Sequence, residues 1–328
     1  MSRLAQYFIL VCGFIGCVIF AFLTCKLLIK YQLKKKISQP IHELGVKKHQ
    51  KKSGTPLFGG VSFYIAPLIF IMIFSPSLFN SERKMGYLIG ISLYFFVGLI
   101  DDLIKAIFKN EKGLSAKIRV ALEILFALVS LFIMGYDEKF SWTMSLYPFN
   151  TQVFLNYLYI FLCVFLILGT SNSCNLLDGL DGLSSGTTLI ALATVMVFAF
   201  LQNEVFLGTY LLFLCGGILG FLILNSHPAK IFMGDCGSLF LGASLAFSVI
   251  YLDKLTLLPF VGFLYAVESI SVIIQVIYFK ITHKRVFLMA PLHHHFELKK
   301  VPEYKITMSY YLIQTSIMIV LLLMRTMI

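Results

Sequence analysis

Charge is what this chain of 328 residues has least of: Asp, Glu, Lys and Arg together make up 13%, and only 16 residues are acidic. A soluble globular domain carries about 25% charged residues, and this composition, with 59% hydrophobic residues, falls far outside that class. The apolar runs recur at lengths near the ~20 residues that a helix needs to cross a bilayer. The shortage of charge therefore predicts an integral membrane protein.

The seven cysteines have no framework spacing, which argues against structural disulfides. Most of them lie inside apolar runs. Cys174 and Cys236 stand beside Asp-Gly elements, where any small residue would fit, and a nucleophile or zinc ligand there is the alternative interpretation. No twelve-residue calcium-binding loop is present either.

The apolar runs predict an all-α, polytopic integral membrane protein with about ten transmembrane helices in one domain, residues 1–328. Run lengths near 20 residues favour a helical bundle over a barrel. The first run is too long for a cleaved signal peptide and has no small-residue cleavage site. The expected spans are 6–31, 57–75, 85–100, 117–135, 152–169, 184–201, 205–224, 238–252, 255–281 and 305–324.

Basic residues predict the orientation of the bundle. Of the 27 Lys and Arg residues, 21 fall in or beside the connections that follow odd-numbered spans. Because Lys and Arg concentrate on the cytoplasmic side, both termini are expected outside the cytoplasm. The cytoplasmic loops are then those near 32–56, 101–117, 170–184, 225–238 and 282–304. The net charge of +11 would attract anionic lipids and anionic substrates, although topology alone explains part of it.

Acidic residues mark the same side. Five of the seven Asp residues lie in the predicted cytoplasmic loops, at positions 101, 102, 178, 181 and 235. Asp178 and Asp181 are three residues apart and each precedes a glycine. If they open a helix, both carboxylates lie on one face. The alternative is a solvated loop in which Asp181 caps the next helix.

The doubled acid Asp101-Asp102 indicates a cation site. Adjacent carboxylates at a membrane boundary repel each other unless a cation lies between them. Lys105 is one helical turn from Asp101 and can pair with it, and Lys109, Lys112, Lys117 and Arg119 form a basic rim. Asp235 lies between two glycines, and Asn172 and Asn175 add amide groups. A few hard oxygen ligands with room for water and phosphate favour Mg²⁺ over zinc.

The ninth predicted span carries a polar stripe, Glu268, Ser271 and Gln275, which must face protein or water. Hydrogen bonding between helices is the plain explanation, and it is favoured for Ser271. The loop that follows contains His293-His294-His295. Imidazoles bind a diphosphate as donors or cations, or ligate a metal.

Four motifs occur in order, each at a predicted cytoplasmic loop: Asp101-Asp102, Asn175-x-x-Asp178-Gly-Leu-Asp181-Gly, Phe232-Met-Gly-Asp235-x-Gly-Ser238 and Pro291-Leu-His-His-His-Phe-Glu297. With them the chain resembles the polyprenyl-phosphate N-acetylhexosamine-1-phosphate transferase superfamily. The histidine motif is similar to that of its phospho-N-acetylmuramoyl-pentapeptide transferase branch. The resemblance extends from about His49 to the tenth span. The chain departs from the family pattern at Thr55-Pro-Leu-Phe-Gly-Gly60, at Leu103, and at Ile41-His-Glu-Leu.

The resemblance implies transfer of phospho-MurNAc-pentapeptide from UDP-MurNAc-pentapeptide to undecaprenyl phosphate. The products are lipid I and UMP, in peptidoglycan synthesis, with Mg²⁺ as cofactor. It also implies a multi-pass protein of the bacterial inner membrane whose site faces the cytoplasm, in contact with membrane lipid, and a homodimer. No nucleic acid is expected as a partner.

The resemblance also implies roles for particular residues. The catalytic set is Asp101, Asp102 and Asp235, with Asp235 as principal Mg²⁺ ligand and Asp178 positioning the metal–nucleotide unit. The predicted nucleotide pocket is Asn175, Asp181, Asn225 and Phe232, with Phe232 stacking on uracil. Lys117, His293, His294 and His295 are expected at the diphosphate and sugar, and Lys105, Asn172, Ser238 and Gln275 complete the binding set. Since a phosphomonoester is largely dianionic at neutral pH, direct attack in one step is preferred over a covalent intermediate.

Two other functions are compatible with some of these features. A UDP-GlcNAc:polyprenyl-phosphate GlcNAc-1-phosphate transferase would share every Asp motif and differ in the histidine loop. A cation-coupled transporter would also contain acidic residues, but its sites usually lie near the bilayer midplane at broken helices. Here the aspartates lie at the expected cytoplasmic ends of spans, and only Glu268 lies deep.

Overall fold

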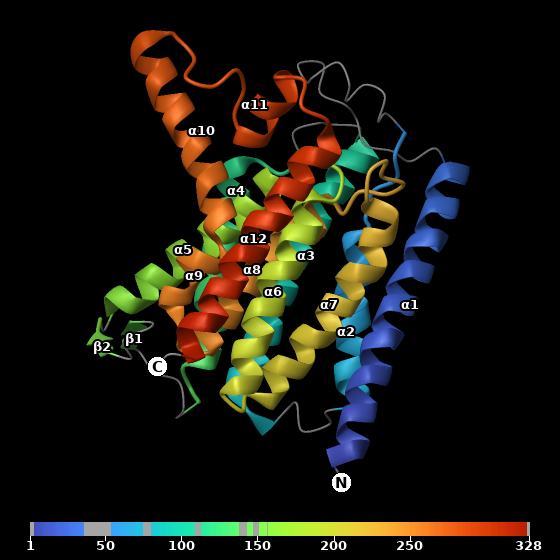
Figure 1. Ribbon diagram of the computed structural model, residues 1–328, viewed down its shortest axis with the longest axis vertical. Helices are drawn as coiled ribbons and strands as arrows, with labels where there is room; N and C mark the ends of the chain where they lie inside the picture. The colour runs from blue at the N-terminus through green and yellow to red at the C-terminus, as the bar shows by residue number, and fades with distance from the viewer. Residues whose placement is uncertain are drawn as a thin grey trace.

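The computed structural model of the chain describes residues 3–35, 54–74, 80–108, 113–137, 143–146, 151–155 and 157–326. Long helices run side by side in a bundle, as Figure 1 shows. Helices satisfy all their backbone hydrogen bonds internally, which is why apolar runs of this length adopt them in lipid. The helices are α1 (Arg3–Lys35), α2 (Gly60–Phe74), α3 (Glu82–Phe108), α4 (Ala116–Met134), α5 (Tyr157–Leu177), α6 (Leu183–Leu201), α7 (Val205–Asn225), α8 (Gly234–Tyr251), η3 (Leu255–Leu257), α9 (Leu258–Val261), α10 (Phe263–Thr282), α11 (Leu292–Leu298) and α12 (Glu303–Thr326).

Eight of these helices are long and apolar enough to cross a membrane: α1, α3, α5, α6, α7, α8, α10 and α12. The apolar helix α2 is shorter, with 15 residues. The 19-residue helix α4 carries three charged side chains. These ten helices fall at the ten predicted positions, so the all-α, polytopic prediction is confirmed. The number of crossings and the side of the membrane on which the termini lie stay predictions.

Three local features differ from the sequence predictions. The predicted ninth span, 255–281, is broken: Pro259 is at the start of the short helix α9, and Gly262 separates α9 from α10. A two-stranded antiparallel hairpin, β1 (Thr143–Leu146) and β2 (Thr151–Phe154), precedes α5. The prediction had placed 152–154 in the fifth span, but the valine and phenylalanine there also favour strands. The helix α11, in the predicted last cytoplasmic loop, follows Pro291.

The centre of the bundle is formed by α7 and α8: in the apolar 18-residue stretch of each, 78% and 89% of the residues are buried. In the outer helices α1, α10 and α12 the same share is only 22–28%, as expected for helices that face lipid. A glycine brings α3 onto α8, because a Cβ at Gly98 would overlap the carbonyl oxygen of Asp235. This close approach places the end of α3 against the start of α8.

The two ends of the bundle differ. The first turn of α1 and the last turn of α12 lie at one end, and α11 lies at the other (Figure 1). At the end where α11 lies, α10 projects away from the other helices (Figure 1). The acidic motifs lie near the end of α3, between α5 and α6, and at the start of α8, and the contacts below join them to one another and to α11 at this end of the bundle.

Candidate active site

The acidic cluster is built where α3 ends and α8 begins. The side chain of Asp102 accepts two backbone N–H groups of the first turn of α8, from Asp235 at 3.1 Å and from Cys236 at 2.9 Å. A carboxylate is favourable at a helix N-terminus, and Met233, the residue that precedes the helix, offers no side-chain cap. Gly234 has φ +76°, and a Cβ there would overlap the Asp102 carboxylate. Asp102 thus anchors α8.

Lys105 lies between the other two carboxylates. Its Nζ is 2.5 Å from Asp101 Oδ2 and 2.6 Å from Asp235 Oδ2, so the predicted Asp101–Lys105 pair is confirmed. The guanidinium of Arg119 is 3.9 Å from the same Asp235 oxygen. The other oxygen of Asp101 accepts the backbone N–H of Leu114. The carboxylates of Asp101 and Asp235 therefore converge on one cationic atom.

The last turns of α5 complete this cluster. Asn175 donates from its Nδ2 to Asp235 Oδ1 at 2.6 Å and to Ser238 Oγ at 2.9 Å. Asn172, one turn earlier, accepts from Arg119 at 2.9 Å. Three of the predicted site residues, Asn175, Asp235 and Ser238, are thus in direct contact.

Two residues of this network were missing from the predicted site. Glu123 on α4 is fully buried and accepts from Asn172 Nδ2 at 2.6 Å. Its neighbour Arg119 was predicted only as part of a basic rim. The signal available for Glu123 was that it is the single acid in its predicted span, because intramembrane carboxylates need a polar partner.

The turn that contains Asp178 and Asp181 does not open a helix, which corrects the predicted geometry. The helix α5 continues to Leu177, α6 begins at Leu183, and the two aspartates lie in the connecting turns. The residue that precedes α6 is Gly182, which has no side chain to cap that helix. Asp181 is buried and its carboxylate accepts the N–H of Ala229, so the solvated loop of the alternative interpretation is not what the structure shows.

Asp181 belongs to a second cluster, with His227 and Glu303. The His227 Nδ1 is 3.0 Å from Asp181 Oδ2 and 3.5 Å from Glu303 Oε2. Asp181 Oδ2 also accepts the N–H of Ala229, and Glu303 Oε1 accepts the N–H of Asp181. These contacts join the α5–α6 turn, the α7–α8 loop and the start of α12.

Asn225 and Phe232, which were expected at the nucleotide, make hydrogen bonds that involve the backbone of neighbouring loops. The buried Asn225 donates to the carbonyl of Ile231 at 2.9 Å and accepts from the Ser185 hydroxyl at 2.8 Å. The backbone of Phe232 pairs with the segment that precedes α2, donating to Pro56 and accepting from Gly59. Whether the Phe232 ring stacks on a base stays a prediction.

The three histidines of α11 have three different surroundings. His293 is fully buried beside Glu268 of α10, and burial lowers its pKa although the Glu268 carboxylate opposes that shift. His294 pairs with Glu297 at 3.1 Å. His295 accepts the backbone N–H of Leu288 through its Nδ1. The Gly179 Cα packs against this helix, because a Cβ there would overlap His293 Nε2.

Two further predicted binding residues lie apart from the acidic cluster. The side-chain oxygen of Gln275 accepts the N–H groups of Val286 and Phe287, and so holds the loop after α10. Lys117 is exposed and lines a shallow cavity of about 480 Å³ with Ala116, Val120, Ala121 and Ile124. It is two residues from Arg119, so the two side chains point to nearly opposite sides of α4. The rim residues Lys109 and Lys112, and the loop from 36 to 53, lie outside the described residues.

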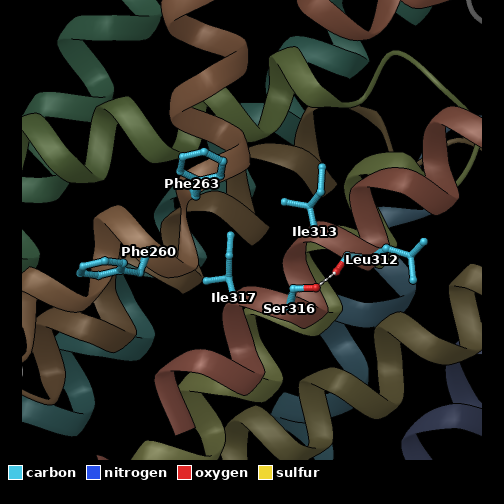
Figure 2. Close-up of a pocket in the computed structure, with 6 residues that line it drawn as sticks. All are labelled: Phe260, Phe263, Leu312, Ile313, Ser316 and Ile317. Carbon is cyan, nitrogen blue, oxygen red and sulfur yellow. Dashed lines mark hydrogen bonds between the residues drawn. The ribbon is translucent and has the colours of Figure 1, made fainter. Parts of the chain in front are cut away.

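Another cavity, of about 380 Å³, lies between α9, α10 and α12 and is lined by no charged side chain. Figure 2 shows its lining: Phe260, Phe263, Leu312, Ile313, Ser316 and Ile317. The one polar side chain among these six, Ser316, donates its hydroxyl to the carbonyl of Leu312 in its own helix. This apolar lining distinguishes it from the charged cluster at the end of α3 and α8.

The charged cluster suits hard cations and phosphates. Two carboxylates already hold one cation, Lys105, between them, and carboxylate oxygens with nearby amide groups are the donors that Mg²⁺ prefers. A bundle of membrane helices with such a site at one end defines a membrane enzyme that handles charged substrates.

The comparison with known proteins gives the family. Residues 84–253 match the family described as glycosyl transferase family 4, and the chain belongs to it. The matched stretch contains the ends of α3, α5 and α8 and thus all five aspartates of the predicted site. The family resemblance inferred from the motifs is confirmed.

Curated relatives extend the similarity to nearly the whole chain. A protein named phospho-N-acetylmuramoyl-pentapeptide-transferase from Caldanaerobacter subterraneus subsp. tengcongensis is 42% identical over 295 residues, which cover 89% of this chain and 91% of that protein. Proteins of the same name from Thermoanaerobacter sp. and Bacillus mycoides are 40% and 37% identical. They cover 88% and 87% of this chain, and 89% and 88% of their own lengths.

Proposed function

We propose that this protein is a phospho-N-acetylmuramoyl-pentapeptide transferase. It transfers phospho-MurNAc-pentapeptide from UDP-MurNAc-pentapeptide to undecaprenyl phosphate and releases UMP and lipid I for peptidoglycan synthesis. Relatives of that name align with nearly the full chain. The observation that carries the proposal is the convergence of Asp101, Lys105 and Asp235 at the end of the bundle where the histidine helix α11 packs.

Mg²⁺ is the proposed cofactor, and Asp235 and Asp101 would hold it, since their oxygens already converge on the Lys105 ammonium. Bound there, it would supply positive charge to the diphosphate and to the leaving UMP. Asp178, the other metal ligand predicted from the sequence, would act as a third ligand from the turn that follows α5. Asn175 donates to Asp235 and so fixes which carboxylate oxygen faces the ligand.

Asp102 and Asp101 have different roles in this proposal. Both oxygens of Asp102 accept N–H groups from α8, so Asp102 positions Asp235 and does not take up a proton from the acceptor. The phosphate of the lipid, with a second pKa of ~6, is already a nucleophile at neutral pH. Arg119 would orient this phosphate directly and Asp101 through the metal that it helps to hold, and transfer would proceed by direct attack in one step.

The proposed location is the bacterial inner membrane, with the site at the cytoplasmic face. The described residues contain eight helices that can span a membrane, and 21 of the 27 basic residues of the sequence fall in or beside the connections predicted to be cytoplasmic. The soluble polyanionic donor and the phosphate of the membrane-bound acceptor can meet only at such a face. A homodimer remains the expected assembly.

The experiment is an assay of purified protein with UDP-MurNAc-pentapeptide and undecaprenyl phosphate. UMP and lipid I should appear with Mg²⁺ and not with EDTA, and the Asp235→Asn variant provides the background. UDP-GlcNAc in place of the donor tests the other transferase branch: comparable rates with both sugars would contradict the muramoyl assignment. No UMP from either sugar would contradict the reaction class.

A further inference from the structure

A buried carboxylate on α10 fastens the histidine helix. Glu268 is fully buried. One of its oxygens accepts the N–H of Leu292 at 2.6 Å, and the other accepts the N–H of His293 at 3.3 Å. The hydroxyl of Tyr310, on α12, donates to that second oxygen. The carboxylate therefore joins three segments that are far apart in the sequence.

These hydrogen bonds satisfy the buried carboxylate of Glu268 and stabilise the short helix α11. A buried carboxylate is strongly unfavourable unless several donors satisfy its oxygens, and the backbone of α11 and the Tyr310 hydroxyl of α12 supply such donors here. The helix α11 has only seven residues and no side-chain cap of its own, since Pro291 precedes it. So short a helix is marginal without outside support. Glu268 supplies the acceptors that a capping side chain would provide.

The fastened helix faces the turn after α5. His293 Nε2 is buried without a hydrogen-bond partner and points at Gly179, where a Cβ would overlap it. The same Cβ would lie 3.1 Å from His294 Nε2. His294 is 14% exposed and is thus the histidine of the two that a ligand can reach. The position of Glu268 thereby fixes His294 beside the Asp178–Gly179 turn.

We propose that Glu268 is a positioning residue for recognition of the nucleotide-sugar donor, and that it acts through His294. This inference rests on the proposed function and on the roles that the sequence resemblance implies, His294 at the diphosphate and sugar of the donor and Asp178 at the metal–nucleotide unit. Glu268 touches no substrate: it holds the first turn of α11, and with it the distance between His294 and Asp178. Binding of the polyprenyl-phosphate acceptor does not depend on the contact between Glu268 and α11.

The first test is amide hydrogen exchange of the full-length protein in detergent, which needs no activity. Glu268→Gln keeps the volume but loses one acceptor oxygen and the charge. The amides of 292 and 293 should exchange at least about tenfold faster in this variant than in the wild type, because local opening becomes easier. Ser271→Ala is the matched control. It is buried one turn along α10 and its hydroxyl donates to the carbonyl of Glu268 in its own helix, so it should leave both amides unchanged.

The second test separates positioning from a general loss of structure. Glu268→Gln should raise the KM for UDP-MurNAc-pentapeptide roughly tenfold and leave the KM for undecaprenyl phosphate unchanged. Tyr310→Phe, which removes one donor and keeps the ring, should shift the same KM in the same direction by less. In a double-mutant cycle with His294→Ala, the second substitution should add nothing to the donor KM, since both act through one group.

Each outcome supports or contradicts one part of the proposal. Unchanged amide exchange at 292 and 293 in Glu268→Gln would contradict the claim that Glu268 holds the first turn of α11. Normal KM values for both substrates, equal rises in both, or additive effects with His294→Ala overturn the positioning role. A wild-type protein that releases no UMP contradicts the proposed function instead, and the exchange experiment still shows whether Glu268 holds α11.

Discussion

Two carboxylate clusters lie at the same end of this molecule and differ in the side chain that lies between their acids. In the first, Asp101 and Asp235 share the flexible side chain of Lys105, with Arg119 nearby. In the second, Asp181 and Glu303 share His227, and backbone N–H groups occupy one oxygen of each acid. The first cluster can exchange its cation without unfolding a loop. The second is built into the backbone of three connections, so its contacts hold loops in place.

The largest expected effect is at the first cluster. Asp235→Asn is nearly isosteric and keeps the contacts of α8, but it removes the charge that a divalent cation requires. We expect turnover to fall at least about a thousandfold, in the range seen when a charge-stabilising group is lost, with little change in the unfolding midpoint. UMP release and thermal unfolding in detergent measure the two quantities. Near-normal turnover at ordinary Mg²⁺ would remove Asp235 from the site.

Asp102→Asn should change stability as well as turnover. The amide can accept only one of the two N–H groups that Asp102 accepts, and a buried unsatisfied donor costs about 1–3 kcal/mol. The unfolding midpoint should therefore fall, unlike that of Asp235→Asn. Thermal unfolding of the two variants side by side checks this contrast. A stable but inactive Asp102→Asn protein would instead assign Asp102 to the chemistry.

His227→Gln tests the second cluster. Glutamine retains a donor for Asp181 but removes the imidazole from between the two acids, and the loop at 226–230 keeps the backbone bond from Ala229 to Asp181. We expect less than a tenfold loss of turnover, expressed as a higher KM for the nucleotide donor. Steady-state kinetics with each substrate varied in turn measure it. A loss as large as that of Asp235→Asn would mean that this cluster takes part in the chemistry.

The smallest expected effect is a pH dependence at His293. Because burial lowers its pKa below the ordinary value, the unfolded chain binds this proton at a higher pH than the native one does. His293 therefore costs stability as the pH falls below about 6.5, and costs nothing above it. The difference in unfolding midpoint between wild type and His293→Gln should vary between pH 5 and 6.5 and stay constant from pH 7 to 8. A constant difference over the whole range would show that the pKa is not lowered.

The sequence was sufficient where the relevant contacts are local. Apolar runs predicted the helices because each span satisfies its own backbone and shows lipid an apolar surface. The pair Asp101–Lys105 followed from helical spacing, and it is present at 2.5 Å. The convergence of the aspartates followed from placing their loops on one side of a membrane, which requires no knowledge of packing.

The sequence was insufficient where contacts depend on how helices pack. Nothing in the chain indicated that Asp181 would meet Glu303, which is 122 residues away, or that Asn172 would join Arg119 to Glu123. The spacing of Asp178 and Asp181 misled because α5 continues six residues past Ser171, to Leu177. The break at Gly262 was missed because both sides of it are equally apolar.

Lys105 has a further consequence for how the site fills. It is the counterion of two aspartates, so a divalent cation held by the same oxygens would compete with it. The Lys105 ammonium could then pair with a phosphate oxygen, and a phosphate bound to Lys105 would in turn leave the two carboxylates open to a cation. By thermodynamic linkage, cation and phosphate each raise the affinity for the other by the same factor. We therefore expect the site to bind either one weakly when alone and the two together tightly.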